Sequence, residues 1–262
     1  MVRALKGLQE VVSVVFVRPH PEDHIQRRWV ISHEIPDDSL ASLKSHEDDF
    51  HSIREIYEKE HDNTSNSIPL LYDNHHECIV NNDAADITNM LNSSFADLCE
   101  NPSLDLLCQN DAATKAKMNE VHDWLYPLLQ LAPSNTPPYY YDLSPRTLQH
   151  AFDRATCILQ KQRYLTSHTL ITEADLKLFV ALIRYEEVYS KYLVQRPPQQ
   201  LLLQNPALMD YCRDIYQLPG VANTVHMGEI RAHFLGTADS CNSNSSATLA
   251  MLQVPHRRHL LV

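Results

Sequence analysis

The sequence predicts two domains of different fold class, an α/β domain at the N-terminus followed by an all-helical domain. Three observations predict it. Val11–Val17 (VVSVVFV) is a continuous, mostly β-branched run, typical of a strand buried on both faces of a mainly parallel sheet. Residues 68–80 contain two short strand-like segments separated by a polar turn. After residue 112, apolar side chains recur at helical spacing between helix-start signals.

The predicted domain limits follow from this change of pattern. We expect the α/β domain to span residues 1–98 and the helical domain to span residues 107–236, with a linker around residues 96–112. Residues 237–262 are first rich in Ser and Asn and then basic and apolar. Such a segment buries little surface, so we expect a disordered tail.

Within the α/β region, each element has a local signal. Gly7 is placed to end a first helix in the left-handed conformation. Residues 34–49 are acidic and irregular, which is typical of a surface loop. A helix is then predicted by four apolar residues on one face: Phe50, Ile53, Ile56 and Tyr57.

A hairpin and a capped helix complete the α/β region. Ile68–Tyr72 and Cys78–Val80 predict two paired strands. Asp83 can cap the helix that follows, whose apolar stripe begins at Ile87. Strand, helix, hairpin and helix is the order found in the later part of a thioredoxin fold.

The helical region contains the strongest local signal. Thr172 predicts an N-cap, and Asp175 three residues later predicts an acidic version of the capping box, worth about 1 kcal/mol. Ser144-Pro145 predicts another helix start, because proline is favoured at the first helical position. Two apolar stripes predict the helices before and after Ser144: Met118, Val121, Leu125, Leu128 and Leu129, then Leu148, Phe152, Ala155 and Leu159.

Composition excludes several function classes. The net charge of −11 argues against nucleic acid or an anionic membrane as a main partner, because both need a basic face. No apolar run approaches the ~20 residues of a membrane span. The chain's 4 glycines leave no GxGxxG and no P-loop, which argues against nucleotide chemistry. The apolar run near the N-terminus lacks a small-residue cleavage site, which argues against a signal peptide.

Cysteine and histidine usage points to a cytoplasmic protein without a metal site. The 6 cysteines lie far apart with no CxxC pair, which is typical of reduced thiols in the cytoplasm. Five of them, Cys78, Cys99, Cys108, Cys157 and Cys212, are interpreted as small core residues. His75-His76 and the pair His46 and His51 lack HExxH spacing and a nearby Cys partner, so we expect solvated loop histidines.

Several stretches together resemble a known family. Leu170–Tyr189 (LITEADLKLFVALIRYEEVY) and Tyr211–Val221 (YCRDIYQLPGV) are similar to the rear-domain signature of glutathionyl-hydroquinone reductases, the Xi class of the glutathione transferase superfamily, related to the omega class. Leu5–Pro19, Ser52–Asn63 and Ser67–Asn92 match the front domain in the same order. The resemblance implies a thioredoxin-like front domain followed by a helical transferase domain.

The resemblance also implies a catalytic cysteine that the sequence does not contain. In the family, a Cys-Pro-Trp-Ala motif stands a few residues before the first matching stretch, and its thiolate attacks the sulfur of a glutathionyl-hydroquinone. Here no Cys precedes Cys78 and none is followed by Pro. With the first strand of the domain also unmatched, Val11–Val17 would lose its inner neighbour. We therefore expect an N-terminally incomplete version of a longer protein.

The remaining site residues are implied by the resemblance one at a time. Ile68-Pro69 stands at the family's Val-Pro, where a cis-proline lets the preceding backbone pair with the cysteinyl group of glutathione; the alternative is a proline that begins a strand. Asp83-Ala84 stands at the family's Glu-Ser, which receives the γ-glutamyl end; the alternative is that Asp83 only caps a helix. Ala84 lacks the serine hydroxyl and so one hydrogen bond of about 1 kcal/mol.

Two tyrosines in the family hydrogen-bond the quinol oxygen. Tyr141 stands at the first, although its loop differs and Tyr139 or Tyr140 could serve instead. Tyr189 stands at the second; the alternative for both is amphipathic packing at a domain edge. The implied ligands are glutathione, as co-substrate, and aromatic or quinol conjugates, without a metal. Family members commonly form homodimers.

Two functions follow as hypotheses. The first is a glutathione-dependent transferase and thiol oxidoreductase of the glutathionyl-hydroquinone reductase type. The second is a non-catalytic module that binds glutathione, a quinol or another protein after loss of the catalytic cysteine. A third option, activation of glutathione by serine or tyrosine as in other transferase classes, has no candidate residue at the required place.

Overall fold

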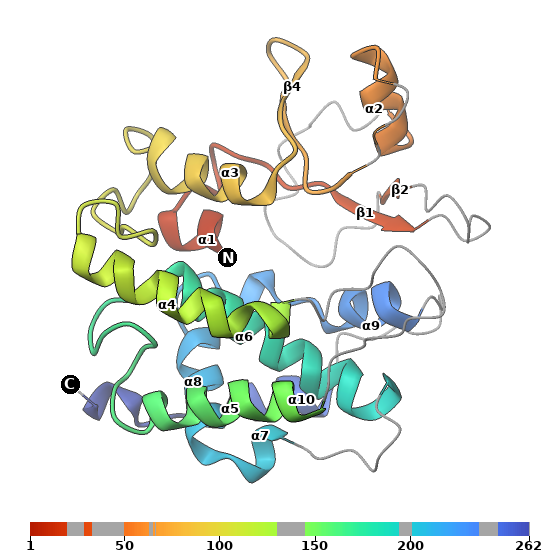
Figure 1. Cartoon of the computed structure of the whole chain (residues 1–262). Coiled ribbons are helices and arrows are strands. Elements are labelled where there is room, and N and C mark those ends of the chain that lie inside the picture. The colour runs from red at the N-terminus through yellow and green to blue at the C-terminus, as the bar shows by residue number, and fades with distance from the viewer. Residues whose placement is uncertain are drawn as a thin grey trace. The chain divides into compact units, whose positions relative to one another are not determined.

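The chain divides into two compact units in a computed structural model that describes residues 1–19, 29–32, 50–62, 65, 67–129, 145–193, 201–235 and 246–261 (Figure 1). The front unit is Val2–Leu104, and the helical unit is Asp105–Val262 together with Met1. The division falls inside the predicted linker. The predicted acidic loop at 34–49 lies outside the described residues.

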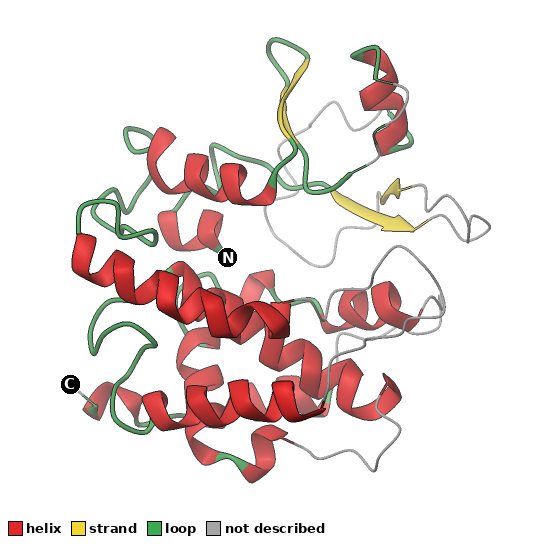
Figure 2. Cartoon of the chain, viewed as in Figure 1, coloured by secondary structure: helices red, strands yellow, loops and turns green. Residues whose placement is uncertain are grey.

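The front unit mixes short strands and helices (Figure 2). Its core consists of Ile53, Ile56 and Tyr57 on one helix, with half-buried side chains from the strands around them, as the apolar face predicted. Strands β1 and β2 form one antiparallel pair, and β3 and β4 form another. The elements are α1 Val2–Lys6, β1 Phe16–Pro19, β2 Trp29–Ser32, α2 Ile53–Lys59, β3 Leu71–Asp73, β4 Cys78–Asn81, α3 Ala84–Asn89 and the π-helix η2 Met90–Ser94.

The first predicted strand is largely wrong. Only Phe16 and Val17 of the β-branched run lie in β1, while Val11, Val14 and Val15 are exposed. Strand β1 pairs with β2 in an antiparallel arrangement, so the described residues contain no parallel sheet. The physical reason is that burial on both faces requires elements packed over both faces of a sheet, and the exposure of Val11, Val14 and Val15 shows that they have no such cover among the described residues.

Gly7 takes the predicted role at the end of α1. Its φ is 70°, and its N–H donates to the Ala4 carbonyl at 3.1 Å while the Leu8 N–H donates to the Arg3 carbonyl at 3.0 Å. These two bonds define a Schellman motif, which needs a left-handed residue and therefore favours glycine. The end of the front unit packs over this turn, since Asn101 Nδ2 donates to the Leu5 carbonyl at 2.9 Å.

The helical unit contains helices and turns throughout its described part (Figure 2). The described side chains of both predicted stripes are buried, for example Leu125 and Phe152, except that of Leu148, which is half-buried. Helix α6 contacts α4, α8 and η3 and forms the centre of the unit. The elements are α4 Ala112–Leu129, α5 Pro145–Leu159, α6 Glu173–Arg184, the π-helix η3 Tyr185–Leu193, α7 Leu201–Gln204, α8 Pro206–Tyr216, the 3₁₀ turn η4 Ala222–Thr224, α9 Met227–Leu235, α10 Ala247–Leu252 and the 3₁₀ turn η6 Arg258–Leu260.

The predicted capping box at the start of α6 is present. Asp175 Oδ2 accepts from the Thr172 N–H at 2.9 Å and from the Thr172 hydroxyl at 3.0 Å. Asp175 Oδ1 also accepts from the Leu165 N–H at 2.8 Å and from the Tyr211 hydroxyl at 3.1 Å. One fully buried carboxylate therefore joins the loop before α6, the start of α6 and helix α8.

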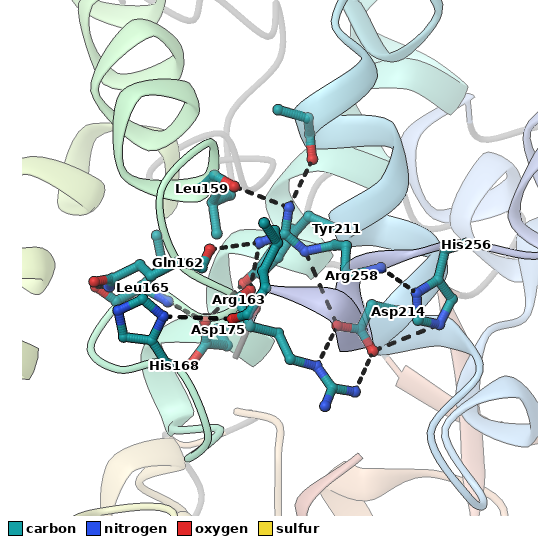
Figure 3. Close-up of polar contacts among 12 residues, drawn as sticks. Leu159, Gln162, Arg163, Leu165, His168, Asp175, Tyr211, Asp214, His256 and Arg258 are labelled. Carbon is teal, nitrogen blue, oxygen red and sulfur yellow. Dashed lines mark hydrogen bonds and ion pairs between the residues drawn. The ribbon is translucent and has the colours of Figure 1, made fainter.

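The C-terminal segment differs from the predicted disordered tail at 237–262. Ala247–Leu252 form α10 and Arg258–Leu260 form η6, while residues 236–245 lie outside the described residues. Arg258 is the reason for this order: its guanidinium donates to the carbonyls of Leu159, Gln162 and Arg163 at 3.0, 2.7 and 2.6 Å (Figure 3). A single arginine therefore satisfies several carbonyls near the end of α5.

Asp214 on α8 balances the charge of this arginine. Its carboxylate accepts two hydrogen bonds from Arg163 at 2.8 Å each and lies 4.0 Å from Arg258 Nε (Figure 3). His256 lies 3.6 Å from the same carboxylate. Asp214 is almost fully buried, and this cluster holds the C-terminal segment against helix α8.

Candidate functional site

The Ile68-Pro69 segment is an exposed turn, and the buried Tyr57 contacts the residue before it, Ser67. The Ile68-Pro69 peptide bond is cis, as predicted. The Tyr57 hydroxyl donates to the Ser67 carbonyl at 3.2 Å and lies 2.9 Å from the Ser67 hydroxyl. Within the part of the chain that the structure describes, the Ile68 N–H and C=O make no hydrogen bond. A strand-like peptide could therefore pair with them.

The start of α3 is the second predicted segment. Asp83 is the N-cap, and its Oδ1 accepts from the Ala85 and Asp86 N–H groups at 2.8 and 2.9 Å. Among the described residues, Asp83 Oδ2 and the Ala84 N–H make no hydrogen bond. One acceptor and one donor thus stand side by side on the exposed surface of the front unit.

Asn82 links these two segments. Its side-chain amide donates to the Tyr57 hydroxyl at 3.1 Å and to the Ser67 hydroxyl at 3.3 Å. Sequence reasoning missed this linkage: Tyr57 was predicted as a core residue, and no motif marks Ser67 or Asn82. The arrangement brings together a free backbone edge, a carboxylate and a helix-start N–H. Such groups can bind an extended peptide that carries an amino-acid zwitterion at one end.

Tyr189 lies in the π-helix η3 of the helical unit. Its side chain is 2% exposed, and the wide turns of a π-helix are frequent at functional sites. The neighbouring Glu187 is also buried, and its carboxylate accepts from Arg231 Nη1 at 2.6 Å. Tyr141, Tyr139 and Tyr140 lie outside the described residues.

Two of the described cysteines, Cys108 and Cys212, are buried. Burial raises the pKa of the Cys108 thiol and of the Cys212 thiol, so both are protonated at neutral pH. Cys157 is exposed on α5, against the prediction that it is a core residue. Across the described ranges, no cluster of three or more His, Cys, Asp or Glu side chains could hold a metal ion.

Comparisons with known proteins show a consistent group. No family model matches the chain. The glutathionyl-hydroquinone reductase YqjG of Escherichia coli K12 is 27% identical over 265 residues, which cover 98% of this chain and 77% of that protein. The glutathionyl-hydroquinone reductase PcpF of Sphingobium chlorophenolicum is 23% identical, over 92% of this chain and 74% of that protein.

Solved structures give the same result. Glutathione-bound YqjG superposes with a TM-score of 0.74 at 25% identity, over 98% of this chain and 82% of that one. A Xi-class transferase from Natrialba magadii gives 0.72 at 26% identity, over 98% and 77% of the two chains. Over 92–98% of its length, the chain is thus similar to glutathionyl-hydroquinone reductases and Xi-class glutathione transferases.

The similarity to these transferases covers both units. The front unit, with its cis-proline turn, hairpin and following helix, is thioredoxin-like, and the rear unit is the helical transferase domain. Among the described helices, none combines the length and the apolar character that crossing a membrane requires.

Proposed function

We propose that this chain is a glutathione-dependent transferase of the Xi class and a thiol oxidoreductase of the glutathionyl-hydroquinone reductase type, and that the front unit binds glutathione. The observation that carries the proposal is the exposed pair formed by Asp83 Oδ2 and the Ala84 N–H, joined through Asn82 to the free backbone of Ile68. Glutathione-bound YqjG supports the same ligand for this fold.

Each part of glutathione has a partner in this arrangement. The γ-glutamyl carboxylate accepts from the Ala84 N–H at the positive end of α3. The γ-glutamyl ammonium donates to Asp83 Oδ2, which the capping bonds leave unused. The cysteinyl backbone pairs with Ile68, next to Pro69, as an added strand.

Two tyrosines are the candidate contacts for the quinol part of a conjugate. Tyr189, with Tyr141 as the second candidate, hydrogen-bonds the quinol oxygen through its phenol. The placement of Tyr189 in η3 supports this role because π-helical turns are frequent at functional sites. A homodimer and a cytoplasmic location are part of the same proposal.

Binding without catalysis is the second candidate, and one observation favours it. Thiol transfer needs a thiolate: the thiolate attacks the glutathionyl sulfur, the quinol leaves with its electron pair and takes up a proton, and free glutathione then resolves the mixed disulfide. No cysteine in the sequence is followed by proline, and the described buried thiols have raised pKa values. A glutathione site can exist without this step.

Calorimetric titration with glutathione tests the binding site. Asp83→Asn keeps the N-cap, because Asn and Asp cap equally well, but removes the charge. We expect the Kd to rise about 10-fold or more, since a hydrogen bond to a charged group contributes about 1.5–3 kcal/mol. Ala84→Ser restores the hydroxyl of the family, and we expect it to lower the Kd about 3- to 10-fold.

The titration can overturn the proposed site, and a turnover assay then distinguishes the two candidate functions. An unchanged Kd in both variants would place glutathione elsewhere and overturn the proposed site. If glutathione binds as expected, turnover of the glutathione conjugate of 1,4-hydroquinone by the same protein distinguishes the two functions. Turnover supports the reductase, and tight binding with no turnover supports the binding module.

A further inference from the structure

The C-terminal helix α10 reaches the π-helix that contains Tyr189. The Thr248 hydroxyl donates to Glu187 Oε2 at 2.7 Å, while Arg231 Nη1 donates to Glu187 Oε1 at 2.6 Å. Thr248 is 1% exposed and Glu187 is 2% exposed. One carboxylate of η3 is thus held from α9 and α10 at once, in a site shielded from water.

Helix α10 is attached to α8 by a separate set of contacts. Gln217 Nε2 donates to the Leu252 and Val254 carbonyls at 2.9 and 2.8 Å, and Arg213 Nε donates to the Met251 carbonyl at 2.9 Å. Because these contacts do not involve Glu187, the C-terminal segment stays attached to α8 when the Thr248 hydroxyl is removed. The effect of the Thr248–Glu187 hydrogen bond on η3 can therefore be measured while the C-terminal segment remains attached to α8.

The conformation of the π-helix η3 depends on contacts with other elements of the helical unit. Its hydrogen-bond geometry is less favourable than that of an α-helix, and long π-helices are rare. In η3, Glu186 Oε2 accepts from the Leu202 N–H at 3.2 Å, and Glu187 binds α9 and α10 as described. Glu187 lies two residues before Tyr189, so fixing its carboxylate fixes the backbone that directs the Tyr189 ring.

We propose that Thr248 and Glu187 are positioning residues for Tyr189, and that the C-terminal segment thereby sets the affinity for the quinol part of the substrate. The effect on affinity rests on the proposed quinol contact of Tyr189, while the effect on η3 does not. The sequence gives no motif for this pair, because residues 187 and 248 lie 61 positions apart.

Two variants of Thr248 isolate the hydroxyl. Thr248→Val keeps the shape and removes the donor, whereas Thr248→Ser keeps the donor. Gln217→Met is the matched control, because it removes two contacts of the same segment without touching Glu187. Hydrogen exchange of the whole chain reports on η3, and titration with the glutathione conjugate of 1,4-hydroquinone reports on affinity.

We expect Thr248→Val to accelerate exchange in residues 185–193 and to raise the Kd of the conjugate about 5- to 20-fold, with the Kd of free glutathione unchanged. Thr248→Ser should restore both values, and Gln217→Met should change neither. Equal changes in Thr248→Val and Gln217→Met, or no change in Thr248→Val, would overturn the positioning role.

Tyr189→Phe separates this proposal from the proposed function. If Thr248→Val accelerates exchange in η3 but neither Thr248→Val nor Tyr189→Phe changes conjugate affinity, the quinol contact is wrong and the support of η3 is upheld. If Tyr189→Phe weakens the conjugate and Thr248→Val does not, the quinol contact is upheld and the positioning role is overturned.

Discussion

The two units differ in how their residues are held. The front unit has a small core around Ile53, Ile56 and Tyr57, and its candidate site consists of exposed groups on turns and a helix start. The helical unit buries the carboxyl groups of Asp175 and Asp214 and satisfies each with several donors. Local stability follows buried contacts, so we infer that the helical unit is the stable support and the front unit opens more readily.

Removing Asp214 should have the largest effect. Asp214→Ala leaves the guanidinium of Arg163 without its carboxylate and removes the carboxylate that lies 4.0 Å from Arg258 Nε, and breaking a buried pair of this kind costs about 3–5 kcal/mol. The free energy of unfolding in urea measures it. Asp210→Ala on the same helix is the control, because its pair with Arg213 is partly exposed and is worth about 0–1 kcal/mol. Equal losses of unfolding free energy in Asp214→Ala and Asp210→Ala would show that the buried cluster contributes no more than a surface ion pair.

Gly7 tests the front unit. Gly7→Ala places a Cβ on a residue with φ of 70°, and that Cβ would lie 2.5 Å from Glu100 Cβ. The left-handed conformation alone costs about 1–2 kcal/mol in an L-residue, so we expect a total loss of about 2–3 kcal/mol. In a Glu100→Gly background the Cβ at position 7 has no Glu100 side chain to overlap. Gly7→Ala should then cost only about 1–2 kcal/mol, from the left-handed conformation. A cost that is the same in both backgrounds would show that the close approach to Glu100 is relieved without penalty.

The smallest effect concerns pH. Burial and the charge of Lys177 lower the pKa of His122 on α4, against an opposing effect of Glu173 and Asp123. The unfolded chain therefore binds a proton at His122 more readily than the folded chain, and stability is lost as pH falls below about 6.5, the pKa of a free histidine.

The corresponding variant is His122→Gln. We expect it to lose less stability between pH 7 and pH 5 than the unchanged protein does, as measured by urea unfolding at both values. His75→Gln, at an exposed histidine in the hairpin turn, serves as the control. A pH dependence in His122→Gln as steep as that of the unchanged protein would exclude His122 as its source.

Local signals were sufficient for much of the fold. The Schellman motif at Gly7, the cap at Asp83 and the capping box of Thr172 and Asp175 depend on residues within a few positions, so the sequence shows them directly. The cis peptide bond at Ile68-Pro69 was predicted from the family resemblance. All of these were predicted and are present.

Long-range pairing was not predictable from the same signals. The β-branched run was assigned to a buried strand because propensity does not show which neighbours a strand has. The C-terminal segment was assigned to a disordered tail because its order depends on Arg258, whose partners lie about 100 residues earlier. For the same reason, the contacts of Tyr57 with Ser67 and Asn82 and of Thr248 with Glu187 have no sequence signal.

Glutathione binding by the front unit is the central claim, and amide chemical-shift mapping of the whole chain tests it most directly. Titration with glutathione should shift the amides of Ile68, Leu70, Ala84 and Ala85 with one common Kd, and Asp83→Asn should weaken that Kd for all four. Absence of shifts at these amides when glutathione is saturating, or shifts confined to residues 105–262, would contradict the account.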